Sequence, residues 1–144
     1  NQGLLAWKVV CTAETAARAA NTRIHSLHLA WNRGLVYRVF GELHLAEKEL
    51  RRAQEGLASA RLPFQYALVS LDLACVLIPS GNLAEVKELA QQAYEIFQAE
   101  GIEERALAAG LAFHRAAEAE RLTQEMALEL TDFLVRYRYR QDHP

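Results

Sequence analysis

The sequence of 144 residues contains few of the residues that interrupt helices or build disulfide scaffolds. Seven glycines and three prolines leave long stretches without a turn signal, and most positions hold residues that lose little entropy in a helix. Two cysteines are too few for a secreted disulfide framework. We therefore expect an all-helical protein with reduced thiols, located in the cytoplasm.

The sequence also lacks a charge excess and a long apolar run. Its net charge of −2 gives no overall attraction to nucleic acid or to an anionic membrane. The most apolar stretch, 68–78, contains Asp72 and is followed by Pro79, so it is shorter than the ~20 residues that span a bilayer. Because the chain begins with Asn1 and not with methionine, we expect it to be a piece of a longer or processed protein.

Turn signals recur at a spacing of about 40 residues, which indicates an internal repeat. Gly41 and Gly81 each lie between two long helical patterns, and Asn21, Arg61 and Gly101 follow the same spacing. Asparagine and glycine readily adopt the left-handed conformation that ends helices. Together with a third junction at Arg121, the pattern predicts seven helices, over residues 3–20, 23–40, 43–60, 63–79, 83–100, 103–119 and 123–139.

These helices form one domain, 1–144, made of a half repeat and three helix pairs. The half repeat covers 1–21, and the complete repeats cover 22–61, 62–101 and 102–141. Apolar residues recur in register on the second helix of each pair, at spacings of four and three that predict one buried face. They are Ala46, Leu50 and Ala53 in the first pair, Val86, Ala90 and Ala93 in the second, and Met126, Leu130 and Phe133 in the third.

The first complete repeat resembles the tetratricopeptide repeat. The resemblance rests on Gly34, Tyr37, Gly41, Ala46, Leu50 and Ala53, with Trp31 one place from the usual tryptophan. It implies a right-handed α-solenoid of antiparallel helix pairs, in which Gly34 marks a close approach of two helices. The run from Ala67 through Gly81 to Phe97 is also similar to helical-repeat regions at the C-terminal end of bacterial regulatory proteins, which implies a bacterial protein.

The resemblance implies a non-enzymatic module that binds a peptide or a partner helix on its concave face, as a scaffold or regulator. Trp31 and Arg38 are the strongest candidates because tryptophan and arginine are enriched in binding hot spots. We expect about half of the apolar groove positions to belong to the core instead. The groove positions that the resemblance assigns are His28, Trp31, Leu35, Arg38, Leu68, Leu71, Cys75, Arg115 and Glu118.

The sequence offers little support for a metal, a cofactor or catalysis. His25 and His28 are three residues apart, but no third ligand follows at a spacing typical of zinc or di-iron sites. No serine or cysteine lies in a nucleophile motif, and no glycine-rich phosphate loop is present. Asp72 is unusual because apolar residues surround it, so we expect a structural role with Arg33, Tyr37 or Arg38 as its partner, with direct contact to a ligand as the alternative.

Two alternatives remain open. The segment Arg136–Arg140 alternates arginine with tyrosine, as single-stranded nucleic-acid binders do. The chain could instead be a structural or oligomerisation segment, since neither end has a polar capping helix. We expect the apolar residues at one or both ends to be covered by another chain or by absent sequence; they are Leu4, Leu5, Trp7, Val9, Val10, Phe133, Leu134, Tyr137 and Tyr139.

Overall fold

The protein is all-helical over the part of the chain that the structure describes. The computed structural model describes the backbone of residues 2–142 and the side chains of 4–137 except 17 and 105. Within these limits it contains helices and turns and no strand, which confirms the predicted all-α class. The helices are α1 (Gln2–Val39), α2 (Leu43–Ser59), α3 (Pro63–Leu77), α4 (Leu83–Ala99), α5 (Glu104–Glu118) and α6 (Gln124–Asp142).

The prediction of seven helices was wrong, because α1 continues through Asn21. The predicted helices 3–20 and 23–40 are one helix of 38 residues. Alanine occupies much of 13–20 and is the best helix former, whereas asparagine alone is a weak stop signal. The hydroxyl of Thr22 donates to the carbonyl of Arg18, 2.9 Å away, so this side chain also finds its partner within the helix.

The other five turns lie where the 40-residue period predicts them. Gly41, Gly81 and Gly101 have φ between +63° and +79°, which glycine adopts without steric cost. Arg61 adopts the same left-handed conformation, and in the last turn this role falls to Glu120, one residue before the predicted Arg121. Turn signals therefore located these helix ends to within a residue or two.

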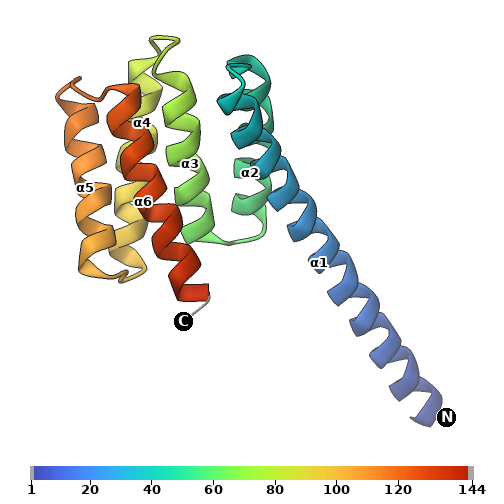
Figure 1. Cartoon of the computed structure of the whole chain (residues 1–144). Helices are drawn as coiled ribbons and strands as arrows, with labels where there is room; N and C mark the ends of the chain where they lie inside the picture. The colour runs from blue at the N-terminus through green and yellow to red at the C-terminus, as the bar shows by residue number, and fades with distance from the viewer. Residues whose placement is uncertain (1, 143–144) are drawn as a thin grey trace.

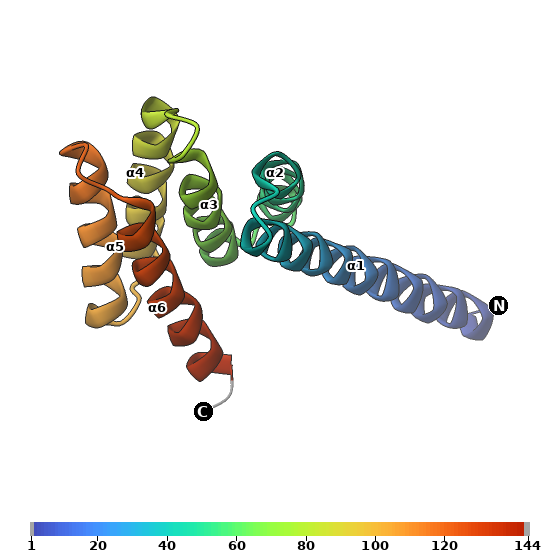
Figure 2. The ribbon, with the colours of Figure 1, turned by 45° about the horizontal axis from the view of Figure 1, so that its top comes forward.

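Four of the helices form a closed ring. In the sequence order α3, α4, α5 and α6, each helix contacts the next, and α6 returns to contact α3. Helix α2 lies against the outer side of α3, and α1 lies against α2 (Figures 1 and 2). The N-terminal half of α1 extends away from this bundle (Figure 1).

The third helix pair is arranged differently from a regular stack. In a stack of equivalent pairs the first helices, α3 and α5, would be neighbours. Instead α6 lies beside α3, and the described residues of α3 and α5 make no contact. Thr131 Oγ1 of α6 is 3.3 Å from Cys75 Sγ of α3, and the rings of Tyr137 and Phe64 meet edge to face with centroids 6.4 Å apart.

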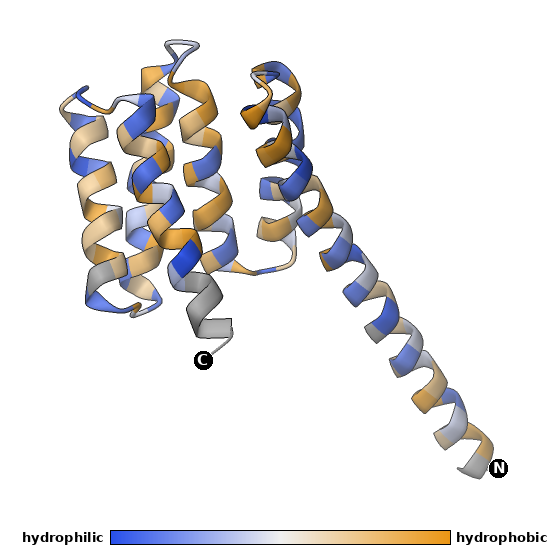
Figure 3. Ribbon diagram, in the orientation of Figure 1, coloured by the Kyte–Doolittle hydropathy of each residue, from blue (hydrophilic) through white to orange (hydrophobic). Residues whose placement is uncertain are grey.

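The core is centred on α3, whose residues 67–77 are all buried. The helix is apolar along most of its length (Figure 3) because α2, α4 and α6 cover it. The predicted buried positions of α2 and α4 are confirmed. On α6 the prediction was wrong by one residue: Ala127, Thr131 and Leu134 are buried, whereas Met126 and Phe133 are exposed, because α6 turns its packing face toward α3.

Candidate partner-binding groove

A buried carboxylate connects α1 to α3. Asp72 is 1% exposed, and the indole N–H of Trp31 donates to its Oδ2 at 2.7 Å. Nη1 of Arg38 donates to Oδ1 at 3.4 Å. Burial raises the pKa of Asp72 to about 6, although the Trp31 hydrogen bond and the Arg38 charge both act to lower it.

Of the three partners predicted for Asp72, which were Arg33, Tyr37 and Arg38, the structure pairs Arg38 with it. Arg33 instead pairs with Glu49 of α2 at 3.3 Å. The contribution of Trp31 was missed, because the repeat pattern assigned its side chain to a ligand. The sequence held a signal for this contact: a buried indole N–H needs an acceptor, and Asp72, forty-one residues after Trp31, is a carboxylate within an apolar run.

Four of the nine predicted groove residues belong to the core. Trp31 is 5% exposed, and Leu68, Leu71 and Cys75 are almost completely buried. Trp31 is buried where α1 meets α3, and α6 covers part of the face of α3 that a regular stack would leave open, with Thr131 against Cys75. Burial also raises the pKa of Cys75 to about 12, so its thiol stays protonated at neutral pH.

The other five predicted residues lie at two separate places. His28, Leu35 and Arg38 are half-buried on α1, and Nε2 of His28 is 2.6 Å from Oε1 of Gln65 on α3. Arg115 and Glu118 are exposed on α5, which contacts α4 and α6 and not α1. The structure therefore does not bring the nine residues together into one surface.

An open groove lies between the C-terminal end of α1 and α6. Both helices contact α3 but not each other within the described residues, and the space between them has a volume of about 540 Å³. The α6 wall of this groove was not predicted, because the regular register of the repeat places α5 there. The lining residues are Arg38, Val39, Gln124, Leu128, Glu129 and Asp132.

The groove combines one anchored cation with an acidic wall and an apolar edge. Arg38 is only 20% exposed and is tied to Asp72, so its position is fixed. Val39 is 78% exposed and forms the apolar edge together with the half-buried Leu128. Glu129 and Asp132 supply the acidic wall, and Asp132 also pairs with Arg136 at 2.8 Å.

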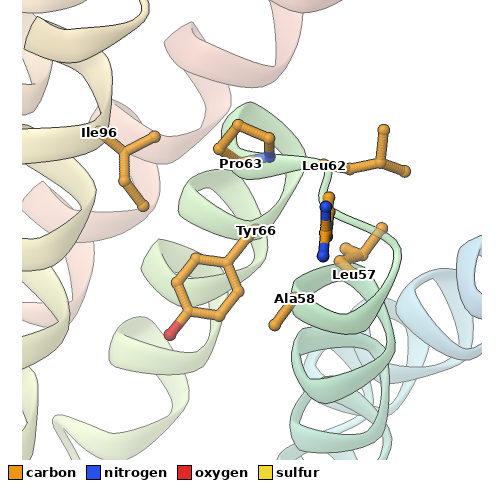
Figure 4. A pocket seen from close by; sticks show the side chains of 7 residues that line it. Leu57, Ala58, Leu62, Pro63, Tyr66 and Ile96 are labelled. Carbon is orange, nitrogen blue, oxygen red and sulfur yellow. The ribbon is translucent and has the colours of Figure 1, made fainter.

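A second pocket, of about 410 Å³, lies at the α2–α3 turn (Figure 4). Its lining is mainly apolar, from Leu57, Ala58, Leu62, Pro63 and Ile96, with Arg61 and Tyr66 as the polar members. The hydroxyl of Tyr66 is already paired with Oε1 of Gln92 at 3.3 Å. This pocket therefore presents fewer unengaged polar groups than the groove.

Two further groups lie within the helix packing. His114 stacks on Tyr94 between α5 and α4, with parallel rings whose centroids are 5.7 Å apart. In the basic C-terminal segment, Arg136 pairs with Asp132, and the hydroxyl of Tyr137 accepts a hydrogen bond from the backbone N–H of Glu103 at 3.1 Å. The side chains of 138–140 lie outside the described residues.

No family model, no curated protein and no solved structure matches the chain. Among the described residues, no helix is long and apolar enough to cross a membrane. In the same part of the chain, no three histidine, cysteine, aspartate or glutamate side chains lie close enough to share a metal ion.

Proposed function

We propose that the chain is a non-enzymatic interaction module that binds an amphipathic partner helix in the groove between α1 and α6. The supporting observation is the groove itself, about 540 Å³ in volume, with a pre-positioned Arg38 at its edge. We further propose that the module is a divergent tetratricopeptide-like array in which the third pair has turned, so that α6 occupies the place of α5.

The lining of the groove defines the chemistry of the partner. Grooves that accept helices bind apolar side chains at spacings of three and four residues. Val39 and Leu128 offer the apolar contacts, and the exposed carboxylates of Glu129 and Asp132 favour a partner that carries lysine or arginine. Arg38 would donate a hydrogen bond to a partner carboxylate or carbonyl at little entropic cost, because Asp72 already orders its side chain.

Selection from a displayed library of amphipathic helical peptides tests the proposal. Selected peptides should carry an apolar stripe and at least one cation, and their affinity should fall as salt rises. The variant Val39→Glu should weaken binding at least tenfold. Phe40→Glu is the matched control, because Phe40 is 76% exposed, similar to Val39, and does not line the groove.

Reversal of the acidic wall provides a second test. In Glu129→Lys with Asp132→Lys, selection should favour peptides that carry glutamate or aspartate. Peptides that bind equally to the Val39→Glu variant and to the unaltered chain would place the binding surface elsewhere and would contradict the proposal.

A further inference from the structure

A buried carboxylate lies directly behind the cation of the groove. Arg38 lines the groove, and its Nη1 donates to Oδ1 of Asp72, which is 1% exposed and does not line the groove. The ion pair therefore has one member inside the protein and the other at the groove surface. Within the described residues, the guanidinium of Arg38 donates to Asp72 alone, which leaves further N–H groups for a bound partner.

The other polar groups around Asp72 on α1 and α3 are few. From α1, Trp31 donates to Oδ2 of Asp72, and His28 lies beside Trp31, with ring centroids 6.3 Å apart. His28 is itself paired with a glutamine of α3. On α3, the thiol of Cys75 follows Asp72 by one turn, and burial keeps it protonated at neutral pH by raising its pKa to about 12. Asp72 is therefore the acidic member of this cluster that can change its charge.

The remaining helices that pack on α3 bring no second cation to Asp72. The buried residues of α2 and α4 are all apolar. Two of the partly exposed charged side chains of these helices, Arg51 and Glu85, pair with each other at 2.7 Å. From α6, Glu129 and Asp132 line the groove and add negative charge to it. Within the described residues, Arg38 is therefore the cation that balances Asp72.

The two hydrogen bonds that Asp72 accepts are unequal. The Trp31 bond to Oδ2 measures 2.7 Å, whereas the Arg38 bond to Oδ1 measures 3.4 Å. A protonated carboxyl group keeps one good acceptor and gains a donor. Because the shorter bond is the stronger one, the proton is expected on Oδ1, where the new O–H meets the N–H groups of Arg38 and releases them. Burial raises the pKa of Asp72 to about 6, which brings this exchange close to neutral pH.

We propose that protonation of Asp72 switches the charge that the groove presents to a partner helix. When Asp72 is ionised, it neutralises Arg38, and the carboxylates of Glu129 and Asp132 favour a partner that carries lysine or arginine. When Asp72 is protonated, the charge of Arg38 is uncompensated, and its guanidinium binds a partner carboxylate. Acidification therefore shifts the preference of the groove from basic toward acidic partners. This inference rests on the proposed function, because it concerns the same groove.

The indole N–H of Trp31 allows the switch to be tested in the free chain. In a Trp7→Phe background the chain has one tryptophan, so one indole N–H resonance reports the ionisation of Asp72 by NMR. Its position should change with pH, with a midpoint near 6, and Asp72→Asn should abolish the change. Arg38→Gln should move the midpoint to higher pH, because it removes the cation that stabilises the carboxylate. A midpoint that Arg38→Gln leaves in place would overturn the proposal.

Binding of a groove-selected helical peptide tests the effect on partners. The peptide is made with glutamate, lysine or glutamine at the same position, and its affinity is measured at pH 7.5 and 5.5 at constant salt. Relative to the glutamine peptide, the glutamate peptide should gain about fivefold on acidification, and the lysine peptide should lose affinity. The Asp72→Asn chain should bind at both pH values as the unaltered chain does at pH 5.5. Asp132→Asn is the matched control, since it removes a groove carboxylate but should keep the pH dependence.

The outcomes separate this inference from the proposed function. By linkage, the glutamate peptide should also move the Trp31 midpoint to higher pH, and the lysine peptide should move it to lower pH. Peptides that lose affinity in Val39→Glu but show the same pH dependence in Asp72→Asn would overturn the switch and leave the proposed function standing. Peptides that bind Val39→Glu unchanged would overturn the proposed function, and a Trp31 midpoint that they do not move would overturn the switch as well.

Discussion

The two halves of α1 share one heptad pattern, with apolar or small residues at alternating spacings of four and three, but have different surroundings. From Leu27 to Gly34 the pattern is buried, with Leu27 and Gly34 against α2, whereas its described positions 6, 10, 13 and 20 face solvent in the single chain. Helix propensity favours both halves, and the helix is continuous between them. The comparison teaches that periodicity identifies the face of a helix that packs and does not identify the element that packs on it.

The two halves of α1 also differ in how a substitution affects the stability of the bundle, although both are helical. In the packed half, folding buries leucine and tryptophan side chains, so substitutions there change the free energy of unfolding of the whole bundle. In the extended half of a single chain there is little burial to lose, so the helix is able to fray without unfolding the rest. Substitutions in matched positions can measure how sharp this boundary is.

The largest expected effect is at Gly34. Gly34→Leu places a side chain where the Cβ alone would lie 2.7 Å from Leu50, and overpacking of this kind should lower the free energy of unfolding by about 3 kcal/mol or more. Ala13→Leu, in the extended half, should leave it unchanged. Urea unfolding of both variants checks this, and an unchanged midpoint for Gly34→Leu would contradict the close packing of α1 on α2.

The next largest effect is the pH dependence of the free energy of unfolding that Asp72 causes. Because its pKa rises from 3.8 to about 6 on folding, the folded chain binds more protons than the unfolded chain between these values. Asp72 therefore contributes roughly 3 kcal/mol to the free energy of unfolding at low pH, and this contribution is lost as the pH rises through 6. The Coulombic attraction of Arg38 is already included in this pKa.

Asp72→Asn isolates that contribution. The amide is similar in shape to the protonated acid and can still accept from Trp31, so the variant should be more stable than the unaltered chain at pH 7 and similar to it at pH 4. Partly exposed carboxylates such as Glu85, whose pKa is lowered by Arg51, act in the opposite direction in both proteins and cancel in the difference. If the difference in free energy of unfolding between Asp72→Asn and the unaltered chain does not change with pH, the raised pKa of Asp72 is contradicted.

Much of the fold was predictable because its signals are local. Glycines located three turns, the 40-residue spacing extended them to the turns at Arg61 and Glu120, and small residues on one stripe located the buried faces of α2 and α4. The prediction of a turn at Asn21 was wrong because helix and turn propensities of neighbouring residues compete there. A run of alanines outweighs one asparagine in that competition.

The site was less predictable because it depends on which helices become neighbours. Assignment of Leu68, Leu71 and Cys75 to a groove assumed that α3 would keep one open face. The contact of α6 with α3 is long-range and leaves no periodic signal that separates it from a contact between α5 and α3. The pairing of Asp72 with Arg38 was found because a charge in an apolar run needs a partner wherever it lies.

A smaller effect is expected at the connection between α2 and α4. Nη1 of Arg51 lies 2.7 Å from Oε1 of Glu85, and Arg51 also pairs with Glu47. Both side chains are partly exposed, so Arg51→Ala should lower the free energy of unfolding by at most about 1 kcal/mol. The loss should shrink in high salt, and a salt-independent loss in urea unfolding would assign the effect to packing of the arginine stem.

The smallest effect is expected in the extended half of α1. Glycine in an exposed helix interior costs about 1 kcal/mol relative to alanine, but only if that helix unfolds together with the rest. Ala19→Gly should therefore reduce helical circular dichroism slightly and leave the urea midpoint unchanged. Leu29→Gly, on the exposed side of the packed half, should lower the free energy of unfolding by about 1 kcal/mol. Equal changes in the free energy of unfolding for the two variants would mean that the whole of α1 unfolds as one unit with the bundle, which would contradict the distinction between its two halves.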